Sequence, residues 1–129
     1  MTRAWGIAWL CLAVCAVGCR SQRASVVLPS GSAPDAYALA SCLNVRSVVE
    51  LVARNGSRED TFRLLNAASR QSTLASQRDP RWLSLRSGVA SLQQGLHEDD
   101  AGGAQLGIAI VRDQCREVGV YLSGSVHRS

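Results

Sequence analysis

Cysteines are the side chains of this sequence with the most chemistry to offer. The chain contains five of them, at Cys11, Cys15, Cys19, Cys42 and Cys115. An odd number normally indicates a free thiol in an exported protein. No Cys-x-x-Cys pair occurs, and the two histidines, His97 and His127, are isolated from one another in the sequence. This pattern does not fit a zinc site, so we predict no metal.

The densest polar cluster is the run His97-Glu98-Asp99-Asp100. Such a run can ligate a metal or supply an acid–base pair. It can also form a turn between two helices, in which the acids stabilise the next helix N-terminus, and we favour this interpretation. The glycines that follow do not match a dinucleotide-binding fingerprint, because their spacing differs and no strand precedes them. Gly103 and Gly107 indicate a close helix contact instead.

All 14 basic residues of the chain are arginines, and the sequence has no lysine. A Walker A loop, a Schiff-base lysine and a Ser-x-x-Lys nucleophile are therefore excluded, because each needs an ammonium group. No nucleophile can be paired with a base by its position in the sequence. We predict a protein that is not an enzyme and holds no cofactor.

The first residues have the order of an export signal. A short cationic start ends at Arg3, and the next 14 or so residues carry no charge. This apolar run is shorter than the roughly 20 residues that span a bilayer as a helix. We therefore expect residues 1–18 to be a signal peptide, which removes Cys11 and Cys15 from the mature protein.

The end of this segment, Ala16-Val17-Gly18-Cys19, resembles the lipobox of bacterial lipoproteins, with Ala16 where the class most often has Leu. The resemblance implies that the thiol of Cys19 receives a diacylglyceryl group and that cleavage precedes it. It implies a location on the extracytoplasmic face of the cell membrane. An ordinary secreted protein and an uncleaved membrane anchor are the alternatives.

With three cysteines assigned in this way, Cys42 and Cys115 remain. An oxidising compartment favours a disulfide between them. The bond would close a loop of about 74 residues, for which the chain-entropy model gives roughly 4.4 kcal/mol. Two separate buried thiols are the alternative.

Beyond a spacer at residues 19–34, rich in Ser and with two prolines, the chain shows helix signals. Asp35 is expected to cap a first helix, and Asn55-Gly56 to end it; residues 47–52 could instead form a strand. Ser57 begins a second helix whose second half is polar and should pack loosely. Asp79-Pro80 begins a third helix, and Asp99 or Asp100 begins a fourth, which Gly119 ends.

Apolar residues recur along each helix at steps of three and four, which predicts one buried face per helix. The stripe of the third helix is the most regular: Trp82, Leu85, Val89, Leu92 and Leu96. Trp82 is expected in the core rather than as a ligand platform. Gly88 and Gly95 lie on one side of this helix, and a close helix approach would explain them.

The two remaining cysteines agree with this arrangement. Cys42 lies near the start of the first helix and Cys115 near the end of the last, both on apolar stripes. In an up-down bundle with an even number of helices these two ends are adjacent, whereas three helices would separate them. The sequence predicts an all-α, up-down four-helix bundle at residues 35–119, closed by one disulfide, with a tail at 120–129.

As a whole, the chain resembles small helical lipoproteins of high-GC Gram-positive bacteria, whose function is often unknown. The resemblance implies a location and an architecture but no reaction. We expect a non-enzymatic interaction module held at the membrane by its lipid anchor, and a small-ligand or cell-wall-binding module is the alternative.

The expected partners are another envelope protein or an anionic surface, and not nucleic acid. A basic face would suit an anionic surface. Arginines are concentrated in the first three predicted helices, at Arg46, Arg54, Arg58, Arg63, Arg70, Arg78, Arg81 and Arg86. Solvated helix faces and a coding bias toward arginine explain them as well.

Overall fold

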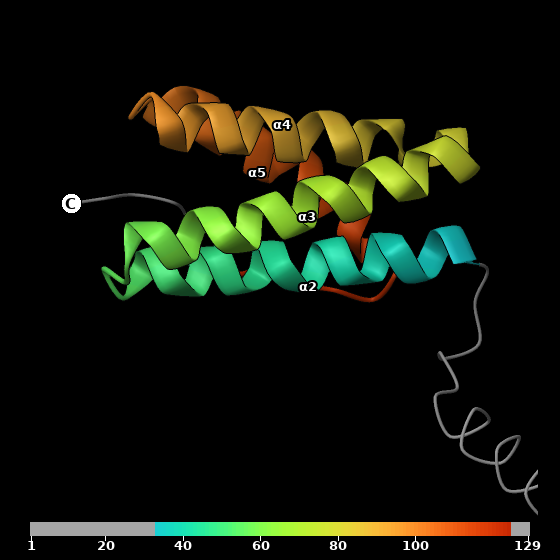
Figure 1. The fold of residues 1–129 in the computed structure, drawn as a ribbon, viewed down its shortest axis with the longest axis horizontal. Helices are drawn as coiled ribbons and strands as arrows, with labels where there is room; N and C mark the ends of the chain where they lie inside the picture. The colour runs from blue at the N-terminus through green and yellow to red at the C-terminus, as the bar shows by residue number, and fades with distance from the viewer. Residues whose placement is uncertain (1–32, 125–129) are drawn as a thin grey trace, which may run out of the picture. The chain divides into compact units, whose positions relative to one another are not determined.

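The computed structural model describes residues 33–124, which form four helices packed up and down (Figure 1). The helices are α2 (Ala33–Ala53), α3 (Arg58–Arg78), α4 (Leu83–His97) and α5 (Ala101–Arg116), with a 3-10 turn, η1 (Pro80–Trp82), before α4. The predicted all-α bundle is confirmed. The predicted signal peptide, the lipidation at Cys19 and nearly all of the spacer lie outside the described residues, as does His127.

Helices α2 and α3 form an antiparallel hairpin (Figure 1). The predicted stripe of α2 is buried, including Cys42, Val45 and Val49, and the strand alternative for residues 47–52 is wrong because they lie within α2. Asn55 adopts a φ of 53°, which ends the helix in the left-handed region. The hydroxyl of Ser57 then accepts a hydrogen bond from the backbone N–H of Asp60 at 3.2 Å, as a helix cap does.

The predicted cap at Asp35 is wrong. Helix α2 already includes Ala33 and Pro34, so Asp35 lies in its first turn. Pro34 fits in this turn because the proline has no backbone N–H, and the N–H groups of a first turn have no partner within the helix. The carboxylate of Asp35 instead pairs with Arg81 and accepts a hydrogen bond from the indole N–H of Trp82 at 3.3 Å. Tertiary partners therefore replace the local backbone contact that the sequence suggested.

The second half of α3 packs closely, contrary to expectation. Ser72 and Ser76 are buried together with Ala68 and Ala75. Each serine hydroxyl donates to a carbonyl of its own helix, Ser72 to Ser69 at 3.0 Å and Ser76 to Thr73 at 2.9 Å. Because the hydroxyls are satisfied within the helix, these serines pack as small core residues.

The third predicted helix begins as expected. The carboxylate of Asp79 accepts from the N–H of Arg81 at 3.1 Å, and Pro80 occupies the first turn. Trp82, Leu85, Val89 and Leu92 are fully buried. The regular apolar stripe of the third predicted helix is therefore part of the hydrophobic core.

Helices α4 and α5 approach so closely that glycine is required between them. A Cβ atom on Gly95 would lie 2.3 Å from the backbone nitrogen of Ala104, and one on Gly107 would lie 2.5 Å from that of Leu92. Backbone atoms cannot move aside as a flexible side chain does. The close helix contact predicted from these glycines is confirmed.

Replacing Gly107→Ala should lower the free energy of unfolding by about 1–3 kcal/mol, the usual cost of overpacking a core. The effect opposes helix propensity, which favours Ala over Gly by about 1 kcal/mol. The matched control is Gly102→Ala in the same helix, where the nearest atom to an added Cβ is a carboxylate oxygen of Asp100 at 3.4 Å. Urea denaturation should show the control unchanged or stabilised; equal stability of the two variants would contradict the close contact.

Helices α2 and α5 are joined by the predicted disulfide between Cys42 and Cys115, whose Cα atoms lie 5.6 Å apart. The alternative of two separate thiols is wrong. After α5 the chain turns at Gly119, with a φ of 77°. The predicted tail is partly core, because Val120 and Leu122 are buried, and the carbonyl of Gly124 accepts from the guanidinium of Arg112 at 3.0 Å.

By length and composition alone, α2 is the one described helix that could cross a membrane. Core helices of soluble domains meet the same criterion. In this fold the buried side chains of α2 include Val45, Val48 and Val49, and Cys42 is bonded to α5. The packing of this buried face therefore accounts for part of the hydropathy of α2.

Candidate functional site

The acidic cluster forms the turn between α4 and α5, as predicted. Asp100 caps α5, because its carboxylate accepts from the N–H of Gly103 at 3.1 Å. Asp99 has a φ of 54° and an ion pair with Arg58 of α3 at 3.6 Å. Within residues 33–124 no group of three or more His, Cys, Asp or Glu side chains is placed to hold a metal ion. The acids are thus used in capping and pairing.

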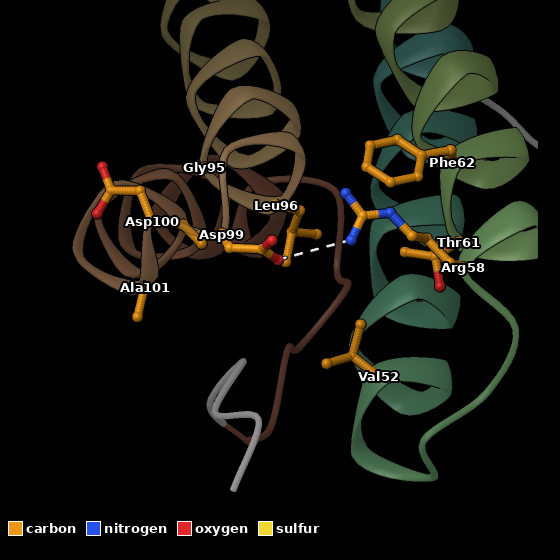
Figure 2. Close-up of a pocket in the computed structure, with 10 residues that line it drawn as sticks. Val52, Arg58, Thr61, Phe62, Gly95, Leu96, Asp99, Asp100 and Ala101 are labelled. Carbon is orange, nitrogen blue, oxygen red and sulfur yellow. Dashed lines mark ion pairs between the residues drawn. The ribbon is translucent and has the colours of Figure 1, made fainter.

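Beside this turn lies a pocket of about 280 Å³. It is at the end of the bundle where α2 ends, α3 begins, α4 ends and α5 begins. Its wall is mainly apolar, and its charged lining residues are Arg58, Asp99 and Asp100, of which Figure 2 shows Asp100 pointing away from Arg58. The apolar residues are Val52, Phe62, Leu96, Ala101 and Ala104, and the facing rim charges are Arg58 and Asp99.

Three contacts hold Arg58 across the rim. Its guanidinium pairs with Asp99, donates to the carbonyl of His97 at 3.3 Å, and lies 5.3 Å from the centre of the Phe62 ring. Figure 2 shows this side chain reaching from α3 toward Asp99, with Phe62 and Leu96 beside it. The guanidinium therefore lies beside the apolar wall, while the Arg58 side chain remains partly exposed.

The wall of the pocket has few polar atoms that need a partner. Val52 and Ala104 are buried, and so is Thr61. The hydroxyl of Thr61 donates to the carbonyl of Ser57 at 2.9 Å. The ring of Phe62 also makes an edge contact with the ring of His97, with centroids 5.8 Å apart. The pocket thus offers apolar contact inside and charge only at its rim.

Trp82 lies at the opposite end of the bundle, close to the start of α2. It is fully buried, so its assignment to the core is confirmed and it is not a ligand platform. Arg81 stacks against the indole at 4.7 Å and pairs with Asp35 and Asp79. The hydrogen bond to Asp35 is the main cause that raises the pKa of the Arg81 guanidinium above its usual value.

Several arginines point into solvent. Among the described arginines, five exposed ones take part in no ion pair, and they are spread over α2, the turn that follows it, α3 and α4: Arg46, Arg54, Arg70, Arg78 and Arg86. The basic face suggested by the sequence therefore stays a prediction.

Sequence reasoning located the disulfide and the acidic turn but missed the pocket. One signal was present: Arg58 and Phe62 are four residues apart, which places them on the same face of a helix. The partner Asp99, 41 positions further on, could be found only from the fold. Comparison of the chain with family models, with curated proteins and with solved structures gives no match, so its function must be argued from its own residues.

Proposed function

We propose that this protein is an exported lipoprotein, anchored through Cys19 at the extracytoplasmic face of the cell membrane. Its helical domain would be a non-enzymatic module that binds another component of the envelope. The observation that carries this proposal is the Cys42–Cys115 disulfide. Disulfides persist in oxidising compartments and are rare in the cytosol, so the folded domain is suited to a location outside the cytoplasm.

The N-terminal sequence supports the same location. A cationic start, an apolar run and Ala16-Val17-Gly18-Cys19 follow one another in the order of a lipoprotein signal. One acyl chain binds a bilayer only marginally, whereas two give stable attachment. A diacylglyceryl group on Cys19 supplies two, which is enough to hold a domain of this size at the surface.

The roles of the polar side chains favour binding over catalysis. The acids nearest to one another serve the fold: Asp100 caps α5 and Asp99 pairs with Arg58. Asp35 and Asp79 both pair with Arg81. Acid–base chemistry needs a group free to exchange a proton with substrate, whereas Asp35, Asp79 and Asp100 each have a partner that belongs to the fold.

Replacing Cys19→Ala should abolish acylation and the cleavage before residue 19, because the diacylglyceryl group has no other thiol in the lipobox to join. Intact-mass analysis should show the acylated, cleaved chain only when Cys19 is present. Reduction should add the mass of two hydrogen atoms in both cases, from the Cys42–Cys115 bond.

The matched control is Cys11→Ala, which changes a thiol inside the apolar run and should leave acylation intact. A parent chain found at full length and without acyl groups would indicate an uncleaved anchor. A parent chain that is cleaved and soluble but not acylated would indicate ordinary secretion. Either result would overturn the lipoprotein assignment.

A further inference from the structure

The pocket at the α4–α5 turn combines an apolar interior with two opposite charges that face each other across its rim. We propose that it binds a free α-amino acid with an apolar side chain. In this arrangement Arg58 holds the carboxylate, Asp99 holds the ammonium group, and the side chain enters the pocket. The inference concerns the folded domain alone, so it stands whether or not Cys19 is acylated.

The rim ion pair is one that a ligand can replace. The Arg58 and Asp99 side chains are 47% and 72% exposed, and their charged atoms lie 3.6 Å apart. An exposed pair at this distance contributes little to stability, so its separation costs little. The guanidinium stays in place when the pair opens, because the carbonyl of His97 and the ring of Phe62 still hold it.

Each rim group matches one end of a zwitterion. The planar guanidinium of Arg58 can donate two parallel hydrogen bonds to a carboxylate. The carboxylate of Asp99 can accept from an ammonium group. The exchange replaces one ion pair by two and leaves no charge without a partner. A simple carboxylic acid would leave Asp99 unpaired, and a simple amine would leave Arg58 unpaired.

The interior sets the kind of side chain. Val52, Phe62, Leu96 and Ala104 offer carbon surface, and the Thr61 hydroxyl is already bonded to Ser57. A polar side chain would lose its water without gaining partners. The volume of about 280 Å³ is just below the range of about 300–1,000 Å³ that is common for small-molecule pockets. A single amino acid with an aliphatic or aromatic side chain fits this size better than a peptide does.

The pocket lies far from the residue at which the described part of the chain begins. It lies at the end of the bundle that contains Val52, at the C-terminal end of α2. The segment that would carry the anchor joins α2 at its other end, at Ala33. Since α2 has 21 residues, the two ends are about 30 Å apart.

Titration of the full chain, disulfide intact, with L-phenylalanine and L-leucine tests the proposal by ¹H–¹⁵N NMR. The backbone signals of Thr61, Leu96 and Ala104 should shift, while the indole signal of Trp82 should not. Phenethylamine and 3-phenylpropionate each lack one charge and should bind at least about tenfold more weakly. Glycine carries both charges but has no side chain to enter the pocket, so it should also bind weakly.

Two variants separate binding from folding. Arg58→Ala and Asp99→Asn should each weaken L-phenylalanine binding by about tenfold or more. Asn tolerates the positive φ of position 99, so the turn should be kept. The control is Arg63→Ala, an arginine of the same helix that pairs with Glu59 and Asp60 away from the pocket, which should leave binding unchanged.

Three outcomes would overturn the proposal: no shift at millimolar amino acid, shifts located away from the pocket, or undiminished binding by Arg58→Ala. Equal binding of phenylalanine and 3-phenylpropionate would overturn the role of Asp99 and with it the zwitterion. If the Trp82 indole signal shows that Arg58→Ala is unfolded, its loss of binding reports on folding. The binding of L-phenylalanine to Asp99→Asn then tests the proposal.

Discussion

Reducing the Cys42–Cys115 disulfide is expected to lower the free energy of unfolding by about 4.4 kcal/mol, because the bond closes a loop of about 74 residues in the unfolded chain. Small domains are stable by only about 5–15 kcal/mol in total. The reduced protein should therefore be close to the limit of stability, and a protein of low initial stability would unfold.

The position of the bond adds to this expectation. Helix α2 packs mainly on α3, and α5 packs mainly on α4, so the first and last helices share little direct surface. The disulfide is the covalent link between them. Without the bond, the two hairpins can separate more easily.

Denaturation with urea should be compared for the oxidised chain, the reduced chain and the Cys42→Ala/Cys115→Ala double variant. The oxidised and reduced forms contain the same side chains, so their difference isolates the cross-link. The double variant adds the loss of two buried sulfur atoms and should be the least stable. Equal midpoints for the oxidised and reduced chains would mean that the bond does not constrain the unfolded state.

The fold was predictable where local signals and long-range constraints agreed. The stripe from Trp82 to Leu92 is regular, and the caps at Ser57, Asp79 and Asp100 use side chains that bond within three residues of themselves. Such contacts depend on local sequence alone. A disulfide between Cys42 and Cys115 then required the first and last helices to place these residues side by side, which predicted an even number of helices.

The errors arose where tertiary contacts overrode local preference. Asp35 has the residue type of a cap, but Arg81 and Trp82 reach it from 46 and 47 positions away. Ser72 and Ser76 are polar by composition, yet each satisfies its hydroxyl within α3 and is buried. Neither outcome could be read from the sequence, because each depends on which helix lies opposite.

The pocket was beyond sequence reasoning for a similar reason. It exists because four helix ends meet without filling the space between them, and no local pattern describes such a gap. Trp82 was expected in the core, and the pocket lies at the opposite end of the bundle, beside Phe62.

Replacing Trp82→Ala should cost about 3–5 kcal/mol in the free energy of unfolding, the range for removing a large buried aromatic side chain. Trp82 is among the largest fully buried side chains and is 0% exposed. Its removal leaves a cavity between the start of α4 and the start of α2, and Asp35 loses the indole N–H as a partner. Both effects act in the same direction.

Two further variants separate these effects. Trp82→Phe keeps an aromatic ring in the core but removes the hydrogen bond to Asp35. It should cost less than Trp82→Ala, and about 1 kcal/mol of its cost should come from the missing hydrogen bond. Leu83→Ala changes the neighbouring residue, which is 53% exposed, and should stay within about 0.5 kcal/mol of the parent. If Trp82→Ala were as mild as Leu83→Ala in urea denaturation, the core would not depend on the indole. The end of the bundle where α2 begins would then be held by the disulfide and the Asp35–Arg81 pair instead.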